Sequence, residues 1–235
     1  MKFQKYMAVG ILGLTMALGF SGCQSENQKN QDAYRKIGIN SMAEGDYDKA
    51  VKSFQKALDT SLGKIGAEEI DICYYKAAAQ FAKKDYDGAI ETYTSLIDYD
   101  KENANAYYLR GSVYLDTDKK DKAFKDYKNA VKYAGREYEI YEGIYENLTN
   151  KGETEEAKNY LKKALDIKPK DGADYAEQGH VYYLLEDYTQ AKSSLDRAID
   201  KDDKTALLYL AEVYNATDQQ EQGQALLESY VKENA

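Results

Sequence analysis

The hydrophobic and polar positions of this chain recur in a fixed order along most of its length. In the clearest copy, the polar segment Gly45–Ala50 (GDYDKA) is followed by the apolar residues Phe54 and Ala57. Apolar residues at intervals of three and four indicate one face of an amphipathic helix. Similar segments begin at Asp85 and Asp187, each followed by the same spacing. The pattern therefore predicts a series of helices separated by short polar turns.

The copies share one register. Their opening segments end in a small residue, mostly at intervals of 34 residues: Ala50, Ala89, Ala123, Ala157, Ala191 and Gly223. A second, mostly small position lies twelve residues before each of these: Gly38, Ala77, Gly111, Tyr145, Gly179 and Ala211. A bulky position lies four residues after each: Phe54, Tyr93, Tyr127, Leu161, Leu195 and Leu227. Small residues at two fixed positions allow a first helix to approach a second closely, and the bulky residue fills the space beside them.

Acidic residues mark the turn between the two helices of a copy. Asp46, Asp85 and Asp187 stand where a helix begins, and a carboxylate there can accept hydrogen bonds from the free backbone N–H groups. The first interval is 39 residues, and its extra residues fall around Thr60–Glu69. We expect a longer turn there, because insertions in repeat proteins collect in loops.

In these positions the segment 31–231 resembles an array of tetratricopeptide repeats. The resemblance implies an all-α fold, a right-handed superhelical solenoid of about six antiparallel helix pairs. The domain is expected to span residues 31–235, with repeats near 31–64, 70–103, 104–137, 138–171, 172–203 and 204–235. The chain departs from the family where Lys76, Arg110 and Gln178 occupy a position usually held by leucine. Tyr145 departs again, since it replaces the small residue of repeat four.

The N-terminus carries a different pattern. Lys2 and Lys5 precede an apolar run of 14 residues, Met7–Phe20, which is short for a membrane-spanning helix of about 20 residues. The tripeptide Ser21–Cys23 (SGC) follows. A charged start, a short apolar core and small residues before a cleavage point are typical of a secretory signal peptide. The placement of the cysteine resembles a bacterial lipoprotein signal.

The lipoprotein resemblance implies that residues 1–22 are removed and that Cys23 is lipidated. Residues 23–30 would then be the lipidated N-terminus and a flexible tether to the repeats. Acyl chains such as palmitate would hold the protein on the cell membrane or outer membrane, facing outside the cytoplasm. Phe20 departs from the family, which usually has leucine three positions before the cysteine. The alternatives are an ordinary secretory signal and a retained anchor.

The amino-acid composition is consistent with a helical protein, and the net charge argues against one class of partner. The 235 residues include one proline and no tryptophan, so little interrupts long helices. There are 24 tyrosines against 5 phenylalanines, and tyrosine suits packed surfaces that are partly wet because its apolar ring carries a polar tip. The formal charge of −9 argues against nucleic-acid partners, since phosphate binding requires a basic face.

The sequence offers little for catalysis. His180 is the only histidine, so a cluster of histidines for metal binding or proton relay is excluded. No phosphate-loop, zinc-helix or nucleophile-elbow motif occurs, and Asp116–Asp121 (DTDKKD) lacks the glycine and glutamate of a calcium loop. Cys73 is expected to be a small core residue. We therefore expect no enzyme activity, no cofactor and no metal site.

In the tetratricopeptide family the first helix of each repeat lines a concave groove, and the register assigns candidate partner-binding residues to that surface. They are Arg35, Tyr74, Phe81, Tyr108, Glu139, Glu142, Glu146, His180 and Tyr183. Aromatic anchors with acidic residues between them suit a peptide that carries basic residues. The alternative is that these aromatic side chains serve packing alone.

Together these features predict a membrane-anchored, extracytoplasmic scaffold or adaptor that holds a protein or peptide partner. One alternative is a lipoprotein that captures a small molecule or glycan for a transporter, although the chain lacks the tryptophan that often stacks on sugars. A second alternative is an accessory subunit of an envelope enzyme, in which the chemistry belongs to the partner.

Overall fold

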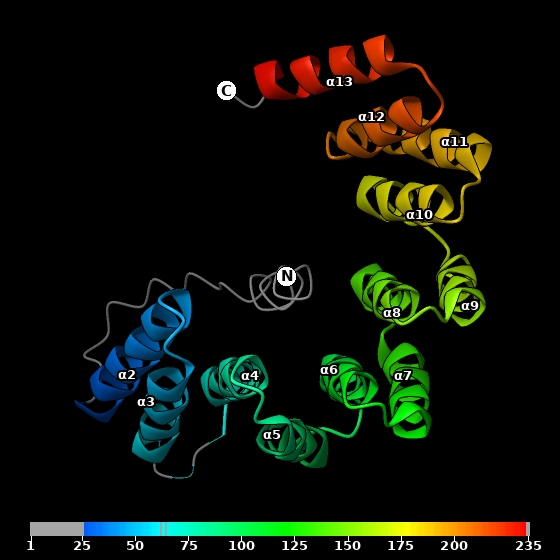
Figure 1. The fold of residues 1–235 in the computed structure, drawn as a ribbon. Coiled ribbons are helices and arrows are strands. Elements are labelled where there is room, and N and C mark those ends of the chain that lie inside the picture. Colours follow the sequence, from blue (N-terminus) through cyan, green and yellow to red (C-terminus); the bar gives the residue numbers. More distant parts are fainter. Residues whose placement is uncertain (1–25, 62, 64, 234–235) are drawn as a thin grey trace. The chain divides into compact units, whose positions relative to one another are not determined.

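The computed structural model describes residues 26–61, 63 and 65–233, and these residues form twelve helices and no strand (Figure 1). The helices follow one another as six pairs: α2 (Glu26–Ala43) and α3 (Tyr47–Thr60), α4 (Ala67–Ala82) and α5 (Tyr86–Tyr99), α6 (Ala104–Asp116) and α7 (Lys120–Tyr133), α8 (Tyr138–Asn150) and α9 (Thr154–Ala164), α10 (Gly172–Leu184) and α11 (Tyr188–Ile199), and α12 (Ala206–Ala216) and α13 (Gln220–Glu233). The all-α repeat architecture expected from the sequence is confirmed.

The chain divides into two compact units between Ala134 and Gly135. Unit 1 contains helices α2–α7, and unit 2 contains helices α8–α13. Within each unit the two helices of a pair pack on each other, and the second helix of one pair packs on the first helix of the next. In unit 2, α10 also packs against α12. This contact brings together the first helices of two successive pairs.

The small residues permit the close approach within a pair. At the second small position, all five alanines are completely buried: Ala50, Ala89, Ala123, Ala157 and Ala191. At the first small position, a Cβ on Gly38 would lie 2.5–2.8 Å from ring carbons of Phe54. A Cβ on Gly179 would lie 2.6 Å from Cγ of Leu195. Both distances are shorter than an ordinary carbon–carbon contact of about 3.5–4.0 Å, so the bulky side chain packs directly on the glycine backbone.

The turns within the pairs share one conformation. In all six pairs of the described residues, the residue five positions before the second small one has a φ of 57–81°: Gly45, Lys84, Asp118, Gly152, Glu186 and Asp218. The next N–H donates to the carbonyl five residues back at 2.8–2.9 Å, as Asp46 does to Ser41. This arrangement is the Schellman motif, which satisfies carbonyl groups at a helix end. Four of the six residues are not glycine, so the hydrogen-bonded turn imposes a conformation that they otherwise rarely adopt.

The helices begin as the sequence predicts. Each carboxylate of Asp46, Asp85 and Asp187 accepts a hydrogen bond from the backbone N–H three residues on, at 3.0–3.1 Å. These three N-caps are therefore confirmed. Helix α3 ends at Thr60 and α4 begins at Ala67, but the connections between α9 and α10 and between α11 and α12 are at least as long. The expected longer turn after the first pair is therefore wrong, because α4, with 16 residues, takes up part of the insertion.

Arg110 is one of the three polar residues that occupy a position usually held by leucine. It forms an ion pair with a nearly buried partner. Its Nε and Nη2 atoms donate to the two carboxylate oxygens of Asp126 at 2.7 and 2.8 Å. Its Nη1 donates to the hydroxyl of Thr94 at 3.0 Å. Only 16% of the Arg110 side chain and 3% of the Asp126 side chain are exposed. At this position a bidentate ion pair between α6 and α7 thus replaces the leucine of the family.

The other departures are also accommodated locally. The hydroxyl of Ser194 donates to the side-chain carbonyl of Gln178 at 3.1 Å, which joins α11 to α10. The ammonium group of Lys76 donates to Gln55 at 2.7 Å, which joins α4 to α3. Tyr145 is half-buried on α8. Polar hydrogen bonds between helices therefore replace the leucine contacts of the family at these positions.

The start of the described chain differs from the expected tether. Helix α2 begins at Glu26, so the described part of residues 23–30 is helical. Glutamine, glutamate and lysine in this segment are good helix formers, and the buried Gln31 donates to Glu69 on α4 at 2.8 Å. The expected signal peptide, residues 1–22, and Cys23 lie outside the described residues. Among the helices that the structure describes, none is long and apolar enough to cross a membrane.

The contact between α2 and α4 contains a pair of carboxyl groups. Glu68 on α4 is hydrogen-bonded to Asp32 on α2. Burial is the largest cause that raises the pKa of Glu68, and the hydrogen bond and charge of Asp32 raise it further, to about 7. The charge of Arg35 acts in the opposite direction. The folded protein therefore holds a proton on this pair at pH values where an exposed glutamate has lost it.

This proton makes the stability of unit 1 depend on pH. Because the pKa of Glu68 is raised in the folded state, its contribution to stability is fully present below about pH 4.5 and is lost as the pH rises through about 7. We expect Glu68→Gln to be more stable than the parent at pH 8, by roughly 0.5–1 kcal/mol after allowance for solvent screening. The two proteins should converge near pH 4.5.

Urea unfolding followed by circular dichroism at a series of pH values measures the difference. Glu44→Gln is the matched control, since Glu44 is an exposed glutamate near the end of α2. An equal pH dependence in the parent and in Glu68→Gln would contradict the shared proton.

Candidate functional site

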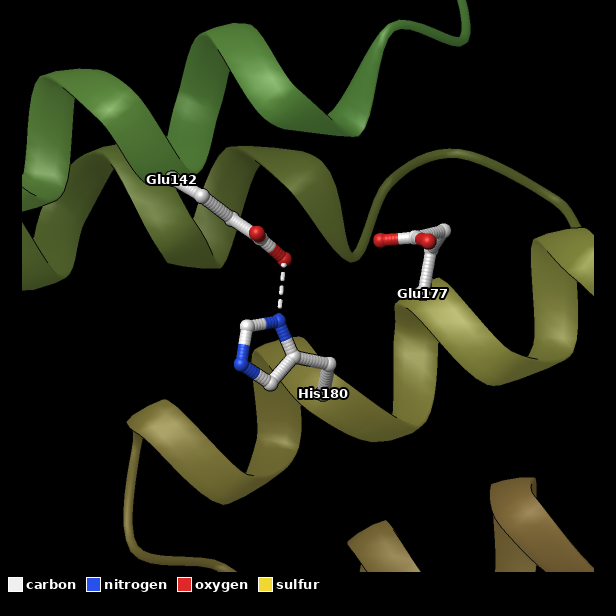
Figure 2. A group of neighbouring side chains, drawn as sticks. All are labelled: Glu142, Glu177 and His180. Atoms are coloured by element: carbon white, nitrogen blue, oxygen red, sulfur yellow. Dashed lines mark hydrogen bonds and ion pairs between the residues drawn. The ribbon is translucent and has the colours of Figure 1, made fainter. Parts of the chain in front are cut away.

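Four polar side chains of unit 2 converge from the first helices of three successive pairs. Glu142 lies on α8, Glu177 and His180 lie on α10, and Tyr209 lies on α12. Residues three apart on a helix project from the same face. Glu177 and His180 therefore stand side by side along α10, with Glu142 opposite the imidazole (Figure 2). We call Glu142, Glu177, His180 and Tyr209 the polar cluster.

Contacts within the polar cluster fix the orientation of the His180 imidazole. Nδ1 of His180 and Oε1 of Glu142 are 2.9 Å apart and form a hydrogen bond. One oxygen of Glu177 lies within 4.8 Å of both partners. The ring of Tyr209 stacks on the imidazole, with centroids 4.4 Å apart and planes 12° from parallel. The hydroxyl of Tyr209 donates to Oε1 of Glu177 at 3.5 Å, so one tyrosine contacts both residues of α10.

The polar cluster gathers negative charge. Burial, and after it the charges of Glu142 and Glu139, raises the pKa of Glu177 to about 7. Burial alone would lower the pKa of His180, but the hydrogen bond and charge of Glu142, with Glu177 and Glu212, raise it overall. Both shifts favour the protonated form. The arrangement is thus suited to holding positive charge among the carboxylates, as a proton or as a cation.

Comparison with known protein families shows to which family the chain belongs. A family model described as TPR repeat matches residues 77–118. A tetratricopeptide repeat model matches residues 32–61, 104–136 and 146–171, and another matches residues 177–234. The chain is a tetratricopeptide repeat protein. Its polar cluster is therefore built from the first helices of repeats four, five and six.

The curated relatives of this tetratricopeptide repeat protein are longer than the chain. It is 21% identical over 217 residues to anaphase-promoting complex subunit 3 from Schizosaccharomyces pombe, which covers 80% of this chain and 33% of that protein. It is 27% identical over 154 residues to tetratricopeptide repeat protein 13 from Homo sapiens, which covers 60% of this chain and 17% of that protein. The chain thus spans about a third or less of these relatives.

A solved structure supports the fold. A tetratricopeptide repeat protein from Parabacteroides merdae is 15% identical and superposes with a TM-score of 0.51. The match covers 88% of this chain and 80% of that one. At this identity the likeness concerns the arrangement of helices alone, so the function has to be argued from the side chains of this chain.

In unit 1, the first two candidate partner-binding residues make contacts within the repeats. Nε of Arg35 donates to Asp71 at 2.8 Å, which joins the first helices of repeats one and two. The hydroxyl of Tyr74 donates to Asn103 at 2.6 Å, at the start of repeat three. Each side chain therefore links neighbouring repeats.

The other two candidates of unit 1 have aromatic neighbours. The ring of Phe81 packs edge-on against Tyr86, with centroids 5.6 Å apart. Tyr108 is buried and lies beside Tyr127, with centroids 6.4 Å apart. These contacts favour the packing interpretation for both rings, and for Tyr108 burial leaves little surface for a partner.

In unit 2, the structure brings several candidates together. Glu142 and His180 belong to the polar cluster, and the ring of Tyr183 lies 6.1 Å from the imidazole in a stacked orientation. Glu139 is exposed on α8 and Glu146 is half-buried on the same helix. Glu142, His180 and Tyr183 therefore lie at one site, and the charge of Glu139 acts on Glu177 within it.

Sequence reasoning missed Glu177 and Tyr209. Both lie two residues before the first small position, which is Gly179 in repeat five and Ala211 in repeat six. The repeat register assigned other positions of the first helix to the groove. It did not include the position two residues before the first small residue. The available signal was the spacing Glu177-x-x-His180, which places two potential ligands on one helix face.

Proposed function

We propose that this protein is a scaffold or adaptor, anchored outside the cytoplasm by a lipid on Cys23, that binds a basic segment of a partner protein through unit 2. Stacked helix pairs support a role in protein binding, because a pre-ordered surface loses less entropy when a partner docks. We place the partner on unit 2 because of one observation. Acidic and aromatic side chains are concentrated on the first helices of repeats four to six.

The surface for the partner surrounds the polar cluster. We define the partner surface as Glu139, Glu146, Tyr183 and Glu212, which are exposed or half-buried on α8, α10 and α12. Its carboxylates would attract lysine and arginine side chains and speed the encounter. Tyr183 offers an aromatic ring of the kind that anchors protein interfaces. A partner with basic residues flanking an apolar one fits this combination.

The anchor rests on the N-terminal sequence. Lys2 and Lys5, the apolar run and the tripeptide Ser21–Cys23 follow the order of a lipoprotein signal. A lipid on Cys23 would hold the repeats at the membrane, where a partner from the same compartment would be captured. Cys23→Ala is expected to move the protein out of the membrane fraction.

Capture from detergent-solubilised membranes tests the partner surface. The full-length protein is expected to recover a protein partner, and raising the salt concentration should weaken the capture because the attraction is screened. The triple variant Glu139→Gln, Glu146→Gln and Glu212→Gln is expected to recover the partner at least tenfold less well. Tyr183→Ala should weaken recovery without changing helicity.

A second triple variant controls for net charge. Glu44, Glu91 and Glu155 are exposed glutamates that do not belong to the partner surface, and their replacement by glutamine removes the same number of charges. If both triple variants recovered the partner equally, the proposed surface would be refuted, whereas loss in the first alone supports it.

A further inference from the structure

We propose that Glu142, Glu177 and His180 form a binding site for one divalent transition-metal ion of the zinc class. The proposal goes beyond the proposed function, because it concerns an ion held inside unit 2 and does not depend on the partner. It rests on the identity, geometry and shielding of three side chains on two helices.

The ligand types fit such an ion. Zinc binds imidazole nitrogen and carboxylate oxygen at about 2.0–2.2 Å, so ligand atoms in a tetrahedral site lie about 3.3–3.6 Å apart. Here one atom from each of Glu142, Glu177 and His180 lies within 4.8 Å of the other two. Glu142 and His180 already face each other at 2.9 Å. The two glutamate side chains would rotate to bring all three atoms to bonding distance of one ion.

The ligands stand on rigid elements and are held in place. Glu177 and His180 project from one face of α10, and Glu142 projects from α8 of the preceding repeat (Figure 2). The ring of Tyr209 stacks on the imidazole at 4.4 Å and fixes its plane. The hydroxyl of Tyr209 reaches Glu177 at 3.5 Å, and contacts of this kind orient the ligands in known metal sites.

The site is shielded yet accessible. The side chains of His180 and Glu142 are 19% and 16% exposed, so an ion could enter from solvent while most of its surroundings stay protected. The carboxylates of Glu142 and Glu177 face one imidazole, and Glu139 and Glu212 add further negative charge around them. A divalent cation would offset this repulsion where solvent screening is weak.

The donor set also selects among ions. Imidazole nitrogen is a poor ligand for the hard ions Ca²⁺ and Mg²⁺, which prefer oxygen alone. A soft ion such as Cu(I) prefers thiolate or thioether sulfur, which the triad lacks. One nitrogen with two carboxylate oxygens suits Zn²⁺ or Co²⁺ and leaves one tetrahedral position for water. On binding, the proton between His180 Nδ1 and Glu142 would leave to solvent as both groups turn to the ion.

Calorimetric titration of the full-length protein with ZnCl₂, after removal of metal with a chelator, tests the site. We expect one equivalent of Zn²⁺ to bind, and Co²⁺ to give the absorption of a tetrahedral nitrogen–oxygen site without thiolate bands. Glu142→Gln, Glu177→Gln and His180→Gln are each expected to weaken zinc binding at least tenfold. Calcium should bind at least a hundredfold more weakly than zinc.

Two variants serve as controls. Glu146→Gln removes a carboxylate one turn after Glu142 on α8, and Cys73→Ser removes a thiol of unit 1 that could bind zinc by itself. Both should keep zinc binding unchanged. Circular dichroism checks folding, and the near-isosteric Glu142→Gln and Glu177→Gln decide the matter if His180→Gln unfolds.

Three results would overturn the site: no zinc binding by the parent, zinc binding that the Glu142, Glu177 and His180 variants leave intact, or equal affinity for calcium. The partner-surface variant keeps all three ligands. Failure of partner capture and failure of zinc binding can therefore be observed separately.

Discussion

Replacing Asp126 by alanine is expected to lower the free energy of unfolding of unit 1 by about 3–5 kcal/mol. The change leaves the guanidinium of Arg110 without the two carboxylate oxygens that it contacts at 2.7 and 2.8 Å. Only 16% of the Arg110 side chain is exposed, so water replaces these hydrogen bonds poorly. An unpaired charge in such surroundings costs more than the ion pair contributes when it is intact.

Urea unfolding of the full-length protein, followed by circular dichroism, measures this loss. The control Asp121→Ala removes an exposed acidic residue from the same helix, α7, and should change stability by less than about 0.5 kcal/mol. The double variant Arg110→Leu and Asp126→Leu restores the leucine typical of the family and removes both charges together. It should be clearly more stable than Asp126→Ala. A double variant no more stable than Asp126→Ala would argue against an unpaired charge as the cause.

Gly111→Ala is expected to lower the free energy of unfolding by about 1–3 kcal/mol. In an exposed helix the same change would stabilise by about 1 kcal/mol, because alanine is the better helix former. Here a Cβ on Gly111 would lie 2.9 Å from two ring carbons of Tyr127 and 3.2 Å from Cβ of Asp126. Tyr127 is completely buried, so its ring cannot turn out into solvent, and we expect α6 and α7 to be pushed apart.

The equivalent position of repeat two provides a reciprocal control. Ala77 is completely buried in a cluster with Ala89 and Tyr93. Ala77→Gly should therefore also destabilise, by about 1 kcal/mol, since it removes a packed methyl group and lowers helix propensity. Thermal and urea unfolding should show that both variants are less stable than the parent, although one adds a methyl group and the other removes one. Stabilisation by Gly111→Ala would contradict the close packing described here.

The fold was predictable from the sequence because its determinants are local and repeated. The small residues and the bulky residue that packs on them recur at fixed intervals, so each copy supports the interpretation of the others. The N-caps at Asp46, Asp85 and Asp187 followed from residue type and position alone. Helix α2 was the exception, because the residues from Glu26 to Gln31 have high helix propensity but no apolar periodicity.

The site was less predictable because its members meet across repeats. Register placed Glu142 and His180 on first helices, but the 2.9 Å contact between them depends on how α8 and α10 are aligned. Tyr209 enters from a third helix at a position that packing alone could explain. The single histidine led to the expectation that no metal site could form, and Glu142, which contacts it, lies 38 residues away in the sequence. Convergence of this kind is a property of tertiary structure.

The shared turn within each pair has a consequence for the speed of folding. Each turn is closed by a hydrogen bond between residues only five apart, and each helix packs mainly on its immediate neighbours in the chain. Little loop entropy is therefore lost before the first stabilising contacts form, and chains rich in such local contacts fold quickly. Folding can begin at any of the pairs and spread to its neighbours. Acquisition of the native structure by each pair therefore does not require the whole chain to be present.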